Sequence, residues 1–361
     1  MLAYFLMFFL VAIPALGQNK RLNGYNLLAI LTIFSIFIGL RHDIGADWSR
    51  YVTIASNYGD QTVMNVVIPR GEYLYRIINW LSSKLGGGIY LVNSICAIIF
   101  ITGLIKYCKA TNYPWLALTI AYPVLILVVS LGYTRQATAI GIEFLLLLAL
   151  EKGLFTKSFI LASLGVGFHL SFMSIGLLII NTLKRYALRF QYFFQFIIAS
   201  GVIGYLGIIA FQRASDRYLS TYVFTEYGNY TSAGAIYRII PTVIAAILII
   251  IYKRKFIEYG SMHVVRIYSN LAFASIFILT LMIIFQSNTT LFDRFALYCS
   301  PLAIFVFTRA VDMKLLNLSR FSSTFLIIST SFLYLAGWLF LGTHAQYWLP
   351  YQNILLPFKI I

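Results

Sequence analysis

The sequence consists of apolar runs, most of them long enough to cross a bilayer, separated by short polar or basic connections. Only 11% of the residues are charged and 60% are hydrophobic, whereas soluble domains carry roughly 25% charged residues. A backbone that crosses lipid must satisfy its own hydrogen bonds, so each run is expected to form a helix. We therefore predict an all-α polytopic membrane protein, a single integral membrane domain over residues 1–361, with about 10 full transmembrane helices near 1–17, 25–40, 89–105, 113–131, 136–150, 193–211, 237–252, 267–286, 292–308 and 321–340.

Basic residues concentrate in the connections that follow alternate spans, near 20–21, 106–109, 152–157, 184–189, 253–266 and 309–320. Cytoplasmic loops of membrane proteins carry an excess of Lys and Arg, so we place these connections inside and both termini outside. The loops explain most of the net charge of +16. No basic and aromatic face typical of nucleic-acid binding is found, and no nucleic-acid partner is predicted.

Residues 158–182 are about one span long, yet basic connections flank them on both sides. Both flanks can be cytoplasmic only if the segment enters the membrane and returns. We predict a re-entrant, broken helical hairpin with its break near His169, where Gly165 and Gly167 also lie. The alternative is one ordinary span followed by a basic outer loop, which would invert the orientation of every later span.

Two outer segments are long enough to contact a substrate, the first large periplasmic loop over 41–88 and the second over 212–236. Within the first loop, the amphipathic pattern of residues 72–85 predicts a helix that lies in the membrane interface. The aromatic stretch over 342–361 is expected to form an interfacial plug.

Arginine at the outer ends of spans marks the main candidate site. Arg41 directly follows an apolar run, Arg135 lies in a connection of only a few residues, and Arg238 and Arg294 repeat the arrangement. Ionisable groups at membrane depth are costly and therefore mark functional sites by default. Because guanidinium groups bind phosphate through paired hydrogen bonds, these arginines favour a phosphate or pyrophosphate ligand.

Several of these motifs also have a structural explanation. The stretch from Arg41 to Tyr51 contains Asp43 and Asp47, so it is either a phosphate clamp with a tight turn at Gly45 or a solvated cap that neutralises its own charges. Two acids four residues apart could bind a metal, but no further acids cluster there and no metal site is predicted. Arg294 either neutralises a phosphate or pairs with the preceding Asp293.

His169 is the main candidate for proton transfer, because imidazole can accept a hydroxyl proton near neutral pH. The alternative is a hydrogen-bonded core histidine. Glu143, inside the span over 136–150, fits this interpretation least. It either pairs with an arginine or belongs to a proton path.

Taken in order, these motifs resemble the EpsG family of Wzy-type bacterial polysaccharide polymerases. The resemblance covers nearly the whole chain and rests on Gly39-Leu40-Arg41, Gly45-x-Asp47, Tyr51, Glu72, Arg135-Gln136-Ala137, Phe168-His169-x-Ser171, Arg294-Phe295, Tyr298 and Pro350-Tyr351. One departure is Gly71-Glu72-Tyr73, where the family pattern has proline after the glutamate. The acid is retained, but the local helix start differs.

The resemblance implies a metal-independent glycosyltransferase without a cofactor, in the bacterial inner membrane, with its active site facing the periplasm. Donor and acceptor would be undecaprenyl-pyrophosphate-linked oligosaccharides at the outer leaflet, and a chain-length regulator protein is considered as a partner. His169 is the first choice as general base, with Asp47 and Glu72 behind it. The pyrophosphate is expected to bind Arg41, Arg135, Arg217, Arg238 and Arg294, and the sugars to contact Tyr51, Tyr133, Gln136, Ser171 and Tyr298.

Three other functions remain open at this point. A transferase resembling O-antigen ligases would use the same donor with a different acceptor. A flippase or transporter of lipid-linked sugars should carry charges along a path through the membrane, whereas here they collect near the outer face. A membrane-bound acyltransferase would also use a buried histidine, but its usual partner motif is not evident.

Overall fold

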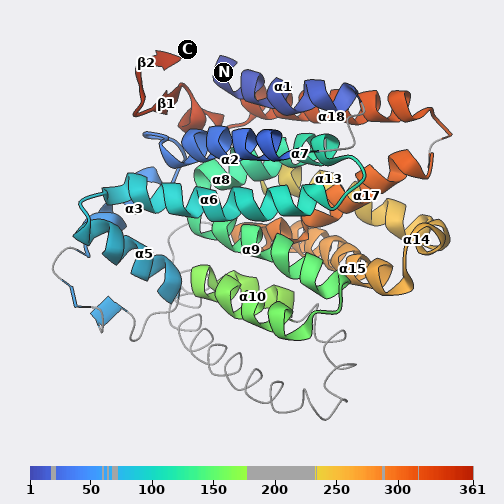
Figure 1. The fold of residues 1–361 in the computed structure, drawn as a ribbon, viewed down its shortest axis with the longest axis horizontal. Helices are drawn as coiled ribbons and strands as arrows, with labels where there is room; N and C mark the ends of the chain where they lie inside the picture. Colours follow the sequence, from blue (N-terminus) through green and yellow to red (C-terminus); the bar gives the residue numbers. More distant parts are fainter. Residues whose placement is uncertain are drawn as a thin grey trace, which may run out of the picture. The chain divides into compact units, whose positions relative to one another are not determined.

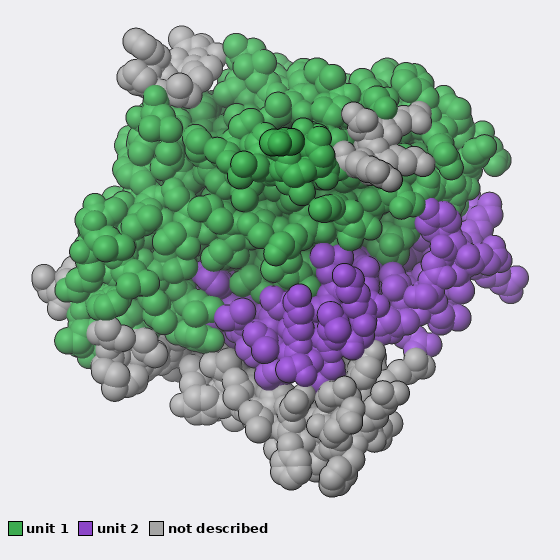
Figure 2. All heavy atoms as spheres, in the orientation of Figure 1, with its two compact units in different colours: residues 1–69, 73–145, 303–361 green, residues 70–72, 146–302 purple. Residues whose placement is uncertain are grey.

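The computed structural model describes residues 1–17, 22–58, 61–62, 65–66, 72–176, 232, 234–286, 289–315 and 317–360. The chain divides into two compact units (Figure 2). The first unit comprises residues 1–69, 73–145 and 303–361, and the second comprises 70–72 and 146–302. The single-domain organisation stays a prediction.

The first unit is built mainly from apolar helices (Figure 1). Its N-terminal half contains α1 (Leu2–Leu16), α2 (Gly24–Gly39), α3 (Trp48–Ser56), α5 (Tyr73–Lys84) and α6 (Gly88–Lys109). A continuous helical run follows, with α7 (Pro114–Ala121), the π-helix η1 (Tyr122–Val129) and α8 (Ser130–Gly132), and then α9 (Thr134–Glu151), which continues into the second unit. The C-terminal part contains α17 (Pro301–Asp312), α18 (Arg320–Leu341), the 3-10 helix η6 (Ala345–Trp348) and an antiparallel pair of strands, β1 (Tyr351–Asn353) and β2 (Leu356–Ile360).

Glycines allow α6 to lie close to its neighbours in this unit. Helix α6 packs against α2 (Figure 1), and a Cβ atom on Gly39 would lie 2.7 Å from Ser94 of α6. On α6 itself, a Cβ atom on Gly103 would lie only 1.9 Å from the carbonyl oxygen of Gly141 in α9. Small residues of this kind let membrane helices approach closely where no hydrophobic driving force holds them together. Helices α2 and α9 therefore both lie close against α6.

The residues after α18 cover the turn that follows α2. Arg41 forms an isolated antiparallel bridge with Asn353, and the Gly45 N–H donates to the Tyr347 carbonyl oxygen at 2.8 Å. The Trp348 indole N–H donates to the Leu127 carbonyl oxygen at 3.1 Å. The interfacial plug predicted for 342–361 thus contacts the Arg41 turn through residues between 347 and 354; its position in a membrane stays a prediction.

The second unit contains α10 (Phe155–Phe168), the 3-10 helix η2 (Leu170–Phe172), α13 (Ala235–Ile251), α14 (Lys253–Tyr259), α15 (Met262–Ile284), α16 (Thr289–Ala296) and the 3-10 helix η5 (Leu297–Cys299). Helix α13 packs along α15 and also contacts α16. The buried apolar residues that join these three helices are Ala235, Ile239, Met282 and Ala296.

The predicted class, a helical membrane protein, is confirmed, although the strands β1 and β2 were not predicted. Within the described residues, four helices are long and apolar enough to cross a membrane, or up to six if each of two bent helix pairs is one span. Every predicted span except two coincides with a helix or a continuous helical run. The span predicted at 193–211 lies outside the described residues, and the one at 292–308 falls on two helical segments, Thr289–Cys299 and Pro301–Asp312, that are bent by 41°. The count of about ten stays a prediction.

The helix break predicted near His169 is confirmed, because α10 ends at Phe168 and His169 is extended, with φ −150° and ψ 123°. Gly165 and Gly167 lie inside α10 and not at the break, which corrects that detail. A Cβ atom on Gly165 would lie 2.5 Å from the Phe172 ring, so this glycine makes room for the chain to fold back after the break. The remainder of the predicted hairpin, 177–182, lies outside the described residues.

Of the two predicted outer loops, the first is described in most of its length. Helix α5 begins at Tyr73, directly after Glu72, where the interfacial helix over 72–85 was predicted. Its position in the membrane interface stays a prediction. Of the second loop, 212–236, only 232 and 234–236 are described.

Candidate active site

The turn after α2 brings the first predicted motif against α8. Asp43 and Gly45 both have a left-handed backbone, with φ 50° and 97°. A Cβ atom on Gly45 would lie 2.9 Å from the Leu131 carbonyl oxygen. The tight turn predicted at Gly45 is therefore present, and it needs glycine for both its φ angle and its close packing.

Arg41 is buried beneath this turn, with 1% of its surface exposed. Its guanidinium donates to the Ile38 carbonyl oxygen at 2.7 Å, to Thr134 Oγ1 at 2.7 Å and to Asn93 Oδ1 at 3.5 Å. Burial lowers the pKa of Arg41 to about 10, so the group stays charged at neutral pH. A buried charge thus joins the end of α2 to α6 and to the first residue of α9.

Arg135, the next residue of α9, is half-buried. Its guanidinium carbon lies 5.7 Å from the ring centres of both Tyr51 and Tyr75. These rings come from α3 and α5 and meet edge to face, with their centres 6.2 Å apart. Arg135 is therefore held by cation–π contacts while part of its side chain remains accessible.

Two buried polar atoms beside these arginines have no hydrogen-bond partner among the described residues, Tyr75 Oη and Asn93 Nδ2. Buried polar groups are normally hydrogen-bonded, and one that is not costs about 1–3 kcal/mol. The Arg41 and Arg135 region of the first unit therefore combines fixed positive charge with unsatisfied polar atoms, which suits an anionic, oxygen-rich ligand.

In the second unit, the break after α10 places His169 among three polar side chains. His169 Nδ1 lies 3.1 Å from Tyr298 Oη and also forms a short hydrogen bond with Ser171 Oγ. On the other side of the ring, Nε2 lies 3.9 Å from Glu72 Oε1. His169 is 7% exposed and Tyr298 1%, whereas Ser171 is half-buried.

Glu72 is held in an unusual conformation, with φ 53°. The same carboxylate oxygen that faces His169 accepts the Leu170 N–H at 3.4 Å. A left-handed backbone is uncommon for a residue other than glycine and costs of order 1–3 kcal/mol. The arrangement Glu72–His169–Ser171/Tyr298 can move a proton, because a carboxylate lies beside one ring nitrogen, where it can stabilise an imidazolium, and hydroxyl groups bond to the other.

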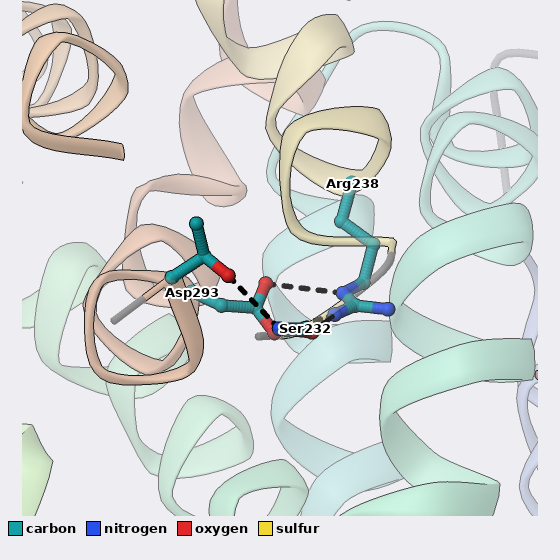
Figure 3. Close-up of polar contacts among 4 residues, drawn as sticks. Ser232, Arg238 and Asp293 are labelled. Carbon is teal, nitrogen blue, oxygen red and sulfur yellow. Dashed lines mark hydrogen bonds and ion pairs between the residues drawn. The ribbon is translucent and has the colours of Figure 1, made fainter. Parts of the chain in front are cut away.

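Arg238 and Asp293 form a buried, two-point ion pair in the same unit (Figure 3). Arg238 Nε lies 3.1 Å from Asp293 Oδ1, and its terminal nitrogen lies 2.5 Å from Oδ2. Ser232 Oγ accepts from Arg238 and donates to Asp293 Oδ2 at 3.3 Å. Arg238 thus links α13 to α16 through Asp293, which lies five residues before Tyr298 in the sequence.

Comparison with known proteins assigns the chain to a family. Residues 25–353, nearly the whole chain, match the model of the EpsG family. The chain belongs to the EpsG family. That family is associated with Wzy-type polymerases and exopolysaccharide biosynthesis, so the chain is a membrane protein of the polysaccharide-polymerase type. No curated protein and no solved structure matches it.

The structure of this EpsG-family protein brings the predicted residues together in separate clusters. Arg41, Arg135 and Tyr51 meet in the first unit, and Glu72, His169, Ser171 and Tyr298 meet in the second. Gln136 is buried and Tyr133 half-buried beside Arg135, and Asp47 precedes α3 at its N-cap. Arg294 is half-buried on α16, and Arg217 lies outside the described residues.

Some residues of these clusters were not predicted. Asn93 and Thr134 hold Arg41, Tyr75 contacts Arg135, and Asp293 pairs with Arg238. Asn93 could have been found, since it is a polar residue inside an otherwise apolar span. Asp43 and Asp47 belong to no group of three or more potential metal ligands in the described part of the chain.

Proposed function

We propose that this EpsG-family protein is a polymerase that joins undecaprenyl-pyrophosphate-linked oligosaccharide repeat units at the outer leaflet of the bacterial inner membrane. The growing chain would leave its lipid pyrophosphate and join the non-reducing sugar of a second lipid-linked unit. The observation that carries the proposal is the Glu72–His169–Ser171/Tyr298 cluster. In a polysaccharide-polymerase family, it offers an oriented base to a hydroxyl acceptor.

Arg135 is our first choice for the pyrophosphate. It is half-buried and follows Thr134, to which Arg41 donates; the other hydrogen bonds of Arg41 go to Ile38 and Asn93. Departure of pyrophosphate develops negative charge, and preorganised cations stabilise that charge most in the transition state. Arg41, which is bonded to Thr134 beside Arg135, would add its positive charge. Arg294 and Arg217 remain candidates, whereas the charge of Arg238 is already neutralised by Asp293.

His169 is proposed as the general base, with Glu72 as the residue that orients it. The acceptor hydroxyl attacks the anomeric carbon, the bond from that carbon to the pyrophosphate oxygen breaks, and the acceptor proton moves towards His169. Asp47 is the second candidate for the base, because it is half-buried at the start of α3. The aromatic and polar side chains of Tyr51, Tyr133 and Gln136 would contact the sugars.

Polymer length on a gel of surface polysaccharide tests the proposal. A deletion strain is complemented with wild type, Arg135→Lys, His169→Ala or the control Arg254→Lys, in which an exposed arginine of α14 is changed. With protein levels matched, we expect single-repeat product from the first two variants and wild-type ladders from the control, because a lysine cannot present the planar fork of arginine. Wild-type ladders from Arg135→Lys and His169→Ala would refute both assignments.

A flippase is the second candidate, and Glu143 is the observation that favours it. This carboxyl group is fully buried in α9, and neither of its oxygens has a hydrogen-bond partner among the described residues. Ionisable groups inside a membrane mark proton paths in many transporters. Loss of even the single-repeat product in the deletion strain would support export and not polymerisation.

A further inference from the structure

Both ring nitrogens of His169 face polar groups of the protein. Glu72 lies on the Nε2 side, and Ser171 and Tyr298 lie on the Nδ1 side. The side chain of His169 is 9% exposed. A sugar hydroxyl that lost its proton directly to His169 would therefore have to displace one of these side chains.

The negative charge of Glu72 favours one tautomer of His169. At 3.9 Å, Oε1 is too far from Nε2 for a hydrogen bond, but the charge of the carboxylate favours the tautomer with the proton on this nitrogen. The lone pair then lies on Nδ1. Ser171 Oγ is closer to Nδ1 than Tyr298 Oη, which is 3.1 Å away. His169 is thus arranged to take a proton from Ser171.

Ser171 is also the hydroxyl that a substrate can reach. Tyr298 is 1% exposed, and its ring meets the buried Phe172 ring edge to face at 5.5 Å. Ser171 is half-buried. The η2 turn that begins after the break in α10 presents the serine outward and turns Phe172 inward against Gly165.

We propose that Ser171 is a catalytic residue that relays the acceptor proton to His169; this inference rests on the polymerase function proposed above. As the acceptor oxygen bonds to the anomeric carbon, its proton passes to Ser171 Oγ while the proton of Ser171 passes to His169 Nδ1. The electron pair of the breaking carbon–oxygen bond leaves with the pyrophosphate. His169 is then an imidazolium beside Glu72, and it returns its proton to water along the same path.

The test uses the purified full-length protein and lipid-linked single repeat units extracted from the deletion strain. Turnover is measured for wild type, Ser171→Ala, Ser171→Thr and the control Ser174→Ala. Ser174 lies on the same segment and bonds only to the Ser171 carbonyl oxygen, at 2.9 Å, in the contacts described. General acid–base steps contribute about 10²–10⁴-fold, so we expect Ser171→Ala to lower kcat by about 10²-fold or more.

The change in KM should stay below about threefold, because the serine acts in the transition state and not in ground-state binding. Ser171→Thr keeps the hydroxyl and should recover most of the rate, and Ser174→Ala should match wild type. In mixtures of H₂O and D₂O, the wild-type rate should fall along a curve, since two protons move together. The much slower Ser171→Ala reaction should give a straight line.

Three results would overturn the relay: wild-type kcat for Ser171→Ala, a straight line for the wild type, or a covalent sugar adduct on Ser171. The adduct would make Ser171 a nucleophile. Failure of the proposed function looks different, because wild-type protein would then form no polymer from the extracted units, or His169→Ala would remain fully active.

Discussion

At the scale of single residues, Glu72 adopts a backbone conformation that glutamate disfavours, and this conformation puts its carboxylate beside His169. Its φ of 53° is unfavourable for glutamate, and a glycine or asparagine would adopt it at less cost. The conformation places Oε1 between the Leu170 N–H and His169 Nε2. Backbone strain of this kind clusters at functional sites, which supports a role for the carboxylate and not for the helix start.

We predict that Glu72→Gln lowers the polymerisation rate by about 10²–10⁴-fold, the range of general acid–base catalysis. The neutral amide neither favours the proton on Nε2 nor stabilises the imidazolium that forms when His169 accepts the Ser171 proton, while its oxygen can still accept the Leu170 N–H. Turnover of lipid-linked repeat units measures the effect. Glu258→Gln, on the exposed side of α14, is the matched control. An unchanged rate with Glu72→Gln would contradict the orienting role.

The sequence alone predicted which residues carry charge at the ends of spans, but not what each charge contacts. Arg41 and Arg238 looked equivalent to Arg135 in sequence. The structure buries Arg41 against Thr134 and pairs Arg238 with Asp293, 55 residues away. Those partners depend on tertiary packing, and spacing along the chain carries no information about them. The Ser171 contact with His169 was within reach, because the two residues are separated by one position at a helix break.

At the scale of helices, the Arg238–Asp293 pair holds α13 to α16. Removing one partner of a buried pair leaves an uncompensated charge and costs about 3–5 kcal/mol. We predict that Asp293→Asn lowers the melting temperature in detergent markedly, and that the exchange Arg238→Asp with Asp293→Arg recovers part of the loss. Thermal unfolding followed by fluorescence measures both.

The comparison for this prediction is Arg320→Gln in the first unit. Arg320 lies 3.9 Å from Asp312, and its side chain is 47% exposed. Asp312 is buried, with 7% of its side chain exposed, and it keeps its hydrogen bonds from Asn112 and Tyr113 when Arg320 is changed. Loss of the exposed partner of such a long pair should cost about 0–1 kcal/mol, so the variant should melt close to wild type. Equal melting temperatures for Asp293→Asn and Arg320→Gln would show that the buried pair does not fasten the helices.

At the scale of the whole molecule, hydrophobic length predicted the long apolar helices, since an apolar run of membrane length has few alternatives to a helix. It did not predict the short helices α3 and α14. It did not predict β1 and β2, because short strands leave almost no periodic signal. Nor did it predict the π-helix over Tyr122–Val129, which continues α7 without any change in composition. Which loops face outward is still predicted only from the distribution of Lys and Arg among them.

That orientation predicts a labelling pattern. Cys96, Cys108 and Cys299 are all buried, so a single introduced cysteine should dominate the reaction with a thiol reagent that cannot cross the membrane. We expect Asp43→Cys to react in intact cells and Lys255→Cys only after permeabilisation. Both positions are exposed on the protein. Reaction of Lys255→Cys in intact cells would instead support a single span over 158–182.

The contact between the turn after α2 and the residues that follow α18 also concerns biosynthesis. Tyr351 donates to the Phe37 carbonyl oxygen at 2.9 Å across a sequence separation of 314 residues. A ribosome delivers α2 to the membrane long before it has made residue 351. Arg41 therefore lacks its bridge partner Asn353 while the helices between them are inserted. The Arg41 turn is therefore among the last parts of the first unit to take its final form. Polymerase activity should appear only after translation has passed this late segment.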